Sequence, residues 1–281
     1  MSNMIVVGVD GWKSSYAALD WAADDAARRG LGVRIVHVRE PWAVEHPLNA
    51  ASDQQTLTEW CEALVRVAAE RVQVRQPGLA VATSVVTGAV AERLRDASRD
   101  ADTVVLGSRG LGRLAGRALG SVGLALAGRV SGPVVIVREV APVAFDEVVA
   151  GFDGSAGAEA ALAYALAQAQ IRGARLRVIY AVQAPHPGGH RSTPAGPTAQ
   201  EVAERLAPWR QKYPDVELTE TVVAGAPPVI LARASRQADL VVVGSRGLGA
   251  LASVVLGSVS HGLLLRAHCP VVVIPPSGTR S

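Results

Sequence analysis

Residues 101–112 read ADTVVLGSRGLG, and residues 238–249 read ADLVVVGSRGLG. In each copy a short aliphatic run, typical of a strand buried on both faces, leads into a glycine-rich turn. The similarity continues as far as residues 122 and 259. Of the 22 aligned positions 16 are identical, which is too many for two unrelated turns. The chain therefore contains an internal repeat.

The repeat covers nearly the whole chain. Residues 5–38 match residues 148–182 at an offset of 143, whereas the glycine-rich segments match at an offset of 137, because the middle segment is longer in the first copy. Copies of about 140 residues have the size of an ordinary domain. We therefore expect two domains, at 1–140 and 146–281. They are joined in segment 138–147, where Pro142 interrupts two strand-like runs.

Strand-like and helical segments alternate within each copy. After the apolar run MIVVGVD, apolar residues recur with helical spacing from Leu19 to Ala26, and Gly30 is placed to end that helix. Further helices are expected at about 52–75, 89–99 and 121–130, each followed by a strand. This alternation predicts an α/β fold: two tandem doubly wound domains, each a five-stranded parallel sheet flanked by helices in flavodoxin-like layering. Ligands of such domains bind beyond the carboxyl ends of the strands, where the strand order reverses.

Composition narrows the class of protein. Apolar residues make up 49% of the chain and charged residues 19%, as in a globular protein. A net charge of +3 is too small to indicate a nucleic-acid face. Two cysteines, Cys61 and Cys269, fit a reducing compartment and not a disulfide framework. Neither a secretory signal nor an apolar run of about 18–20 residues is found. We expect a cytoplasmic protein that binds neither nucleic acid nor membrane.

The glycine-rich segments have the features of a phosphate site. Glycine lets backbone N–H groups approach an anion closely, so we expect a β-carbon at Gly107 or Gly244 to obstruct that approach. After the second glycine and nine further residues, a Gly-Ser pair opens a helix, where N–H groups and the helix dipole favour a phosphate. Ser121 and Ser258 are expected either to cap that helix or to bond the phosphate. The common P-loop is absent, and the dinucleotide fingerprint belongs after the first strand. A plain tight turn remains an alternative for one copy alone.

The spacing G-x2-G-x9-G-[ST] resembles that of universal stress proteins of the ATP-binding class. It is carried by Gly107, Gly110, Gly120 and Ser121, and again by Gly244, Gly247, Gly257 and Ser258. The turns GVDG and GFDG after each first strand also match this family, as do the endings SGPVVIV and HCPVVVI. The resemblance covers both copies nearly from end to end.

The resemblance implies one ATP site in each domain. The turns at Asp10 and Asp153 would lie against the nucleoside, and the backbone near Val38 and Ala181 would meet the adenine. The glycine-rich segments would hold ribose and phosphates. Mg²⁺ would be bound through the phosphates without a dedicated protein site. The remaining residues expected at the two sites are Gly8, Val9, Arg109, Val122, Gly151, Phe152, Arg246, Val259 and Ser260.

The resemblance also implies a nucleotide-dependent regulator of stress response or growth, acting on unknown protein partners. One alternative is a slow ATPase, or an enzyme that phosphorylates itself at Ser121, Ser258 or Ser260. Another is an interaction protein whose last strands pair edge to edge, since unpaired sheet edges invite such pairing. We expect a homodimer and no dedicated enzymatic activity, because no general base stands beside the phosphate loop in the sequence.

The two copies differ at several candidate positions. Lys13 of the first copy aligns with Ala156, and it either reaches a phosphate or begins a solvated helix. Gly123 replaces Ser260, so the two sites are expected to differ in affinity. Arg109 and Arg246 are expected to touch phosphate or to pair with an acidic neighbour. Other residues are given structural or surface roles: His37 (core or rim), Trp60 and Cys61 (packing), His186 and His190 (surface loop), His261 (no catalytic role) and Cys269 (small buried residue).

Overall fold

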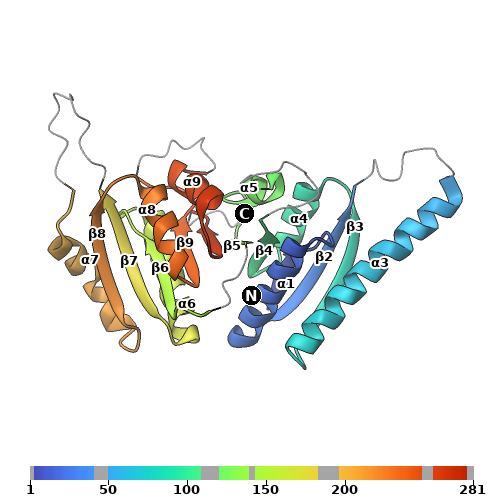
Figure 1. The fold of residues 1–281 in the computed structure, drawn as a ribbon, viewed down its shortest axis with the longest axis horizontal. Helices are drawn as coiled ribbons and strands as arrows, with labels where there is room; N and C mark the ends of the chain where they lie inside the picture. The colour runs from blue at the N-terminus through green and yellow to red at the C-terminus, as the bar shows by residue number, and fades with distance from the viewer. Residues whose placement is uncertain are drawn as a thin grey trace. The chain divides into compact units, whose positions relative to one another are not determined.

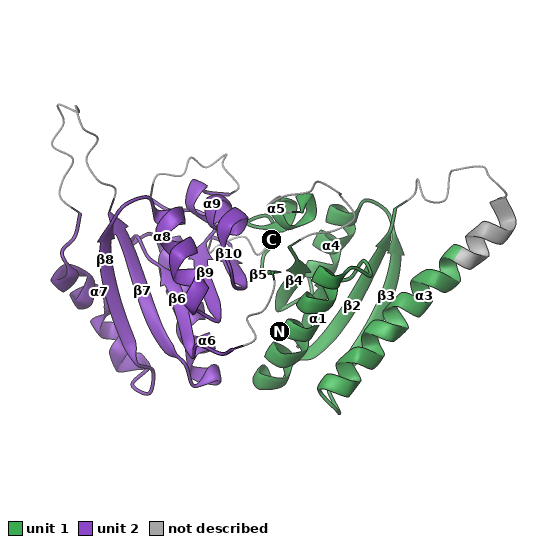
Figure 2. Cartoon of the chain, viewed as in Figure 1, with its two compact units in different colours: residues 1–139, 280 green, residues 140–279, 281 purple. Residues whose placement is uncertain are grey.

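The fold is that of a computed structural model, which describes residues 3–40, 50–108, 120–138, 143–182, 196–248 and 256–276, with the backbone alone at 50–56. The chain divides into two compact units (Figure 2). Unit 1 comprises Met1–Glu139 and unit 2 comprises Val140–Thr279.

Within the described residues, unit 1 alternates strands and helices along the chain (Figure 1). Its sheet has the order β3-β2-β1-β4-β5, and its strand pairs are parallel. The elements are β1 (Met4–Gly8), α1 (Lys13–Arg29), β2 (Gly32–Arg39), α3 (Ala50–Arg75), β3 (Val81–Thr87), α4 (Val90–Ser98), β4 (Thr103–Gly107), α5 (Ser121–Leu126) and β5 (Val134–Val137).

Unit 2 repeats this arrangement, with the strand order β8-β7-β6-β9-β10 and parallel pairing. Its described elements are β6 (Glu147–Gly151), α6 (Ala156–Arg172), β7 (Arg175–Val182), α7 (Ala199–Lys212), β8 (Leu218–Ala224), α8 (Pro227–Ala234), the 3₁₀ helix η1 (Ser235–Gln237), β9 (Leu240–Gly244), α9 (Ser258–Arg266) and β10 (Val271–Ile274). The predicted tandem α/β fold is confirmed.

The central strands form the core of each unit. Ile5, Val6 and Val7 of β1 are fully buried, as are Val148 and Val149 of β6, because helices cover both faces of the sheet. In unit 1, α1 packs beside α3, and α4 packs beside α5. Right-handed crossovers in this strand order place the two pairs on opposite faces. The order reverses between β1 and β4, and between β6 and β9, as a doubly wound sheet requires.

The first helix of each unit ends where the sequence predicts. Gly30 and Gly173 adopt left-handed conformations, with φ of 64° and 63°, and their N–H groups bond the last turns of α1 and α6. The fourth helix is shorter than expected, because α5 stops at Leu126 and not near residue 130. Gly128 follows with φ of 76°, a conformation that an α-helix cannot continue. Among the described residues, no helix is long and apolar enough to cross a membrane.

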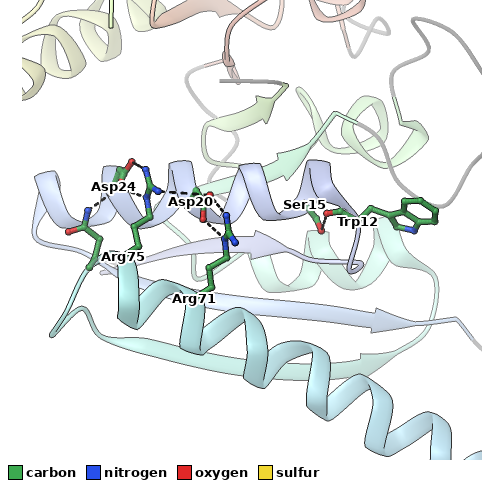
Figure 3. Close-up of polar contacts among 7 residues, drawn as sticks. Trp12, Ser15, Asp20, Asp24, Arg71 and Arg75 are labelled. Atoms are coloured by element: carbon green, nitrogen blue, oxygen red, sulfur yellow. Dashed lines mark hydrogen bonds and ion pairs between the residues drawn. The ribbon is translucent and has the colours of Figure 1, made fainter. Parts of the chain in front are cut away.

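Helices α1 and α3 are joined by ion pairs that two aspartates of α1 make with two arginines of α3 (Figure 3). Arg71 donates to both carboxylate oxygens of Asp20 at 2.6 and 2.7 Å, and Arg75 donates to both oxygens of Asp24 at 2.8 and 2.7 Å. The corresponding helices of unit 2, α6 and α7, are joined differently. There the indole Nε1 of Trp209 donates to Glu159 at 3.1 Å.

Candidate functional site

Each unit has a turn after its first strand that contains Asp10 or Asp153, and we call it the aspartate turn. This turn and the start of the glycine-rich segment lie at the same edge of the sheet. β1 pairs with β4 through Val7 and Val105, and β6 pairs with β9 through Ala150 and Val242. Because these strands are parallel, the segments that follow them leave the sheet side by side. The residues after β1 and β4, and after β6 and β9, therefore meet where the strand order reverses.

A backbone hydrogen bond closes each glycine-rich segment into a ring. In unit 1 the carbonyl of Ser108 accepts from the N–H of Gly120 at 2.9 Å. In unit 2 the carbonyl of Ser245 accepts from the N–H of Gly257 at 2.7 Å. The second Gly-Ser pair is thereby held beside the end of the strand, although its glycine lies 12 positions after the bonded serine in each unit. Arg109 and Gly110 lie outside the described residues.

Glycine, and not serine, occupies the cap position of the following helices. Gly120 and Gly257 have extended backbones at the N-caps of α5 and α9, and neither helix has a side-chain cap. The expectation that Ser121 or Ser258 caps the helix is therefore wrong, because both serines occupy the first helical position, where they are exposed. Val122 and Val259, which follow them, are half-buried. The N-cap residue of neither helix therefore supplies a side-chain oxygen to the first-turn N–H groups, a condition that favours an anion site.

Asp153 connects the aspartate turn of unit 2 to its glycine-rich segment. Its Oδ1 accepts from the N–H of Ser155 at 3.0 Å, and its Oδ2 accepts from the N–H of Leu248 at 3.1 Å. Gly247 lies so close that a β-carbon there would collide with Oδ2. The equivalent carboxylate in unit 1, that of Asp10, accepts from the N–H of Trp12 at 3.0 Å. The Asp153–Leu248 contact was not predicted, since it joins residues far apart in sequence.

The two units differ beside the hydrogen bond that closes the ring. The hydroxyl of Ser260, which is 1% exposed, lies within hydrogen-bond distance of the carbonyls of Ser245 (3.1 Å) and Gly257 (3.0 Å). Gly123 replaces it in unit 1, where a β-carbon would lie 2.9 Å from Cδ1 of Ile136. A side chain at the position that braces the ring in unit 2 would require Ile136 to shift in unit 1.

Gly107 and Gly244 are required by helix packing. A β-carbon at Gly107 would lie 2.6 Å from the backbone oxygen of Ser14, and one at Gly244 would lie 2.8 Å from the backbone of Gly157. Both neighbours belong to the first turn of the helix that follows the aspartate turn. These glycines therefore allow close approach of α1 to β4 and of α6 to β9. The close approach of a ligand expected from the sequence stays a prediction. Gly8 and Gly151 are packed in a similar way, against Leu106 and Leu231.

The residue before each turn aspartate, Val9 or Phe152, contacts the second strand of its unit, β2 or β7. The carbonyl of Val9 accepts from Nδ1 of His37 at 2.8 Å, which fixes a proton on that nitrogen. Phe152, at the equivalent of Val9, contacts the ring of Tyr180 edge to face. The half-buried residues Val38 and Ala181 lie near the ends of β2 and β7, and pair with Val86 and Val223.

Several other predicted residues can be placed. Lys13 is exposed at the first position of α1, and His261 is exposed on α9. The Nε atom of Arg246 is buried without a hydrogen-bond partner among the described residues. His186 and His190 lie outside them. Within the described ranges, no group of three or more His, Cys, Asp and Glu residues could hold a metal ion.

The expectations for Cys61, Trp60 and Cys269 have different outcomes. Both cysteines are buried, as predicted, and burial raises the pKa of each thiol. Trp60 does not belong to the core, because 53% of its surface is exposed. The buried face of α3 contains Cys61, Leu64 and Val65, and Trp60 lies one position outside that spacing. That offset is the signal in the sequence that distinguishes it from the packing residues.

The sequence matches the universal stress protein family over residues 1–138 and 144–275. A universal stress protein of Mycolicibacterium smegmatis is 36% identical over 290 residues, which cover 97% of each chain. One from Mycobacterium tuberculosis is 36% identical over 285 residues, covering 96% of each chain.

Among solved structures, that of a universal stress protein from Archaeoglobus fulgidus superposes with a TM-score of 0.76. It covers 99% of this chain and 100% of its own, at 22% identity. This likeness concerns the fold. The family match covers both repeats, and the mycobacterial relatives extend over nearly the full length. The chain therefore belongs to the universal stress protein family, with two family domains in tandem.

Proposed function

We propose that each unit binds one molecule of ATP at the carboxyl ends of its central strands, and that occupancy by ATP regulates a stress or growth response. The observation that carries this proposal is the contact between Asp153 and Leu248. It brings together the turn assigned to the nucleoside and the segment assigned to the phosphates. The closed ring between Ser245 and Gly257 supports the same assignment, and unit 1 has its counterpart between Ser108 and Gly120.

The proposed phosphate site uses backbone groups. Gly257 caps α9 without a side chain, so the N–H groups of the first turn point to where a phosphate would lie. Ser258 is exposed at the first helical position, where its hydroxyl can donate to a phosphate oxygen. Mg²⁺ would take its ligands from phosphate oxygens and water, which suits an ion that needs few protein ligands. It would neutralise phosphate charge there.

A binding module of this kind acts through occupancy. In this mode of action, a protein partner would distinguish the unit with ATP bound from the unit without it. A dedicated enzyme would need a base positioned beside the transferred phosphate. Self-phosphorylation at Ser260 is disfavoured, because its buried hydroxyl already bonds backbone carbonyls. Ser121 and Ser258 are exposed and remain possible acceptors.

The test is the nucleotide content of the purified chain. The protein is denatured, the released nucleotides are identified by mass spectrometry, and their molar ratio to protein is determined. A ratio near two for ATP, or two sites on titration with Mg²⁺-ATP, is the expected result. A chain that carries no nucleotide and binds none on titration overturns the proposal.

The same samples separate the alternatives. Steady accumulation of ADP would indicate a slow ATPase, and phosphoserine would indicate self-phosphorylation. Retention of function after nucleotide binding is lost would favour an interaction protein. The cytoplasmic location and the homodimer expected from the sequence remain predictions, and light scattering of the eluted protein measures the oligomeric state.

A further inference from the structure

The surroundings of the aspartate turn differ between the two units. In unit 1, Leu64 of α3 lies against the turn, because a β-carbon at Gly11 would lie 3.2 Å from its Cδ1. Trp60 lies one helical turn earlier on α3, and Trp12 follows the turn itself. Trp12 is 48% exposed, and its indole projects beyond the start of α1 (Figure 3). The turn is therefore bordered by apolar and aromatic side chains.

The ring of His37 packs against the indole of Trp60 and positions it. The two rings meet edge to face, with centroids 5.8 Å apart and an interplanar angle of 74°. His37 is 7% exposed and bonds the carbonyl of Val9, so it does not turn freely. Trp60 is thus positioned by a buried neighbour, yet more than half of its surface remains open to solvent. An exposed indole supported in this way can stack on a planar ring.

The described residues of unit 2 do not repeat this arrangement. At the 137-residue offset Trp60 falls on Pro197, before α7 begins, and Ser155 stands in place of Trp12. Beside the turn lies a cation in place of Leu64: a β-carbon at Gly154 would lie 2.6 Å from Nη1 of Arg205. The two sites therefore share a glycine-rich segment but differ at the end assigned to the nucleoside.

We propose that Trp60 is a base-binding residue of the unit 1 site, where its exposed indole stacks on the heteroaromatic base of the bound nucleotide. The inference rests on the proposed function, and the occupant follows from continuity with the site. His37 links Trp60 directly to Val9, which adjoins Asp10. The unit 1 site then depends on the base more strongly than the unit 2 site does. Stacking of a base on an aromatic side chain tolerates different bases, so a purine is preferred only through its larger ring.

The test compares a ligand with a base and one without. The full-length parent and Trp60→Ala are titrated calorimetrically with Mg²⁺-ATP and with ribose 5-triphosphate. Trp60→Ala is expected to weaken ATP binding at one of two sites by about tenfold, within the range for loss of one stacked base. Its affinity for ribose 5-triphosphate should be unchanged. The loss should persist in the Asp153→Ala chain, where unit 1 supplies the remaining site, and Trp60→Phe should restore most of the affinity.

Val74→Ala is the matched control, because Val74 is 84% exposed on the same helix and lies about 20 Å along it from Trp60. Unchanged ATP binding by Trp60→Ala overturns the inference, as does an equal loss for both ligands, which would indicate a structural role. If the parent binds two ATP molecules, either result leaves the proposed function intact. If the parent binds no ATP, the proposed function is overturned, and the inference that rests on it is overturned with it.

Discussion

The Oδ2 atom of Asp153 accepts the N–H of Leu248 at 3.1 Å, so the carboxylate after β6 holds the segment after β9. Removing this acceptor with Asp153→Ala should release the segment and remove the polar group assigned to the nucleoside. We expect the variant to bind one ATP per chain in place of two, and the Leu248 amide to exchange faster with solvent. Calorimetry and hydrogen exchange measure the two effects.

Asp215→Ala is the control for the Asp153 variant, since it removes the same charge from an exposed position of unit 2. It should bind two ATP molecules. If Asp153→Ala also binds two with parental affinity, the carboxylate has no place in the site.

Gly107→Ala and Gly244→Ala should destabilise the protein directly. Each β-carbon would overlap the backbone of the neighbouring helix, and overpacking of this kind typically costs about 1–3 kcal/mol. The midpoint of urea unfolding should therefore fall in both variants. Ser121→Ala and Ser258→Ala, at exposed positions nearby, should stay within about 0.5 kcal/mol of the parent. Parental midpoints for the glycine variants would mean that the strand ends and helices are not so close.

The pair between Asp24 and Arg75 should make stability depend on pH. Burial alone raises the pKa of Asp24, but hydrogen bonds from Arg75 and Gln76, with the charges of Arg75 and Arg28, outweigh it and lower the pKa. A lowered pKa stabilises the fold above the unfolded value of about 4, and this contribution is lost as pH falls through the folded value. Asp24→Asn should cost up to about 1 kcal/mol at pH 7.

Urea unfolding of Asp24→Asn and the parent at a series of pH values measures this contribution. The difference should shrink below pH 4 or so, where the parental carboxylate becomes protonated. Glu70→Gln is the comparison, because the Arg66–Glu70 pair is 67% and 62% exposed and should contribute less. A constant difference across the series would mean that the charge of Asp24 is not responsible.

Both cysteines should be unreactive in the folded protein. Burial raises the pKa of the Cys61 thiol and, more strongly, that of Cys269, so the reactive thiolate is scarce at neutral pH. A thiol reagent such as DTNB should label neither residue in the native state and both in denaturant. Rapid native labelling of Cys269, which is 2% exposed, would contradict its buried position just before β10.

The sequence predicts much of this fold because the deciding features are local. The apolar run at β1 and the helical spacing from Leu19 to Ala26 each lie within a few residues. Gly30 and Gly173 end their helices because each adopts a left-handed backbone conformation, which glycine favours. The predicted end of α5 was wrong because the prediction did not take into account that Gly128, with its positive φ, stops the helix.

The candidate site was less predictable because its contacts join distant segments. The motif glycines could be found from spacing, but the neighbour of Gly107 is the backbone of Ser14, which belongs to a different element. The Asp153–Leu248 bond spans 95 residues, and no local pattern indicates it. The prediction that Trp60 packs in the core was wrong. Its apolar character suggested the core, but it lies one residue before Cys61, outside the buried face of α3.

The helix contact in unit 1 joins Asp20 to Arg71 and Asp24 to Arg75, whereas Trp209 joins Glu159 through a neutral donor in unit 2. Dissolved ions screen pairs of opposite charge, and the Debye length falls from about 8 Å at physiological ionic strength to about 3 Å at 1 M. Added salt should therefore loosen the contact between α1 and α3 more than that between α6 and α7. We therefore expect the two copies of this fold to respond unequally to ionic strength.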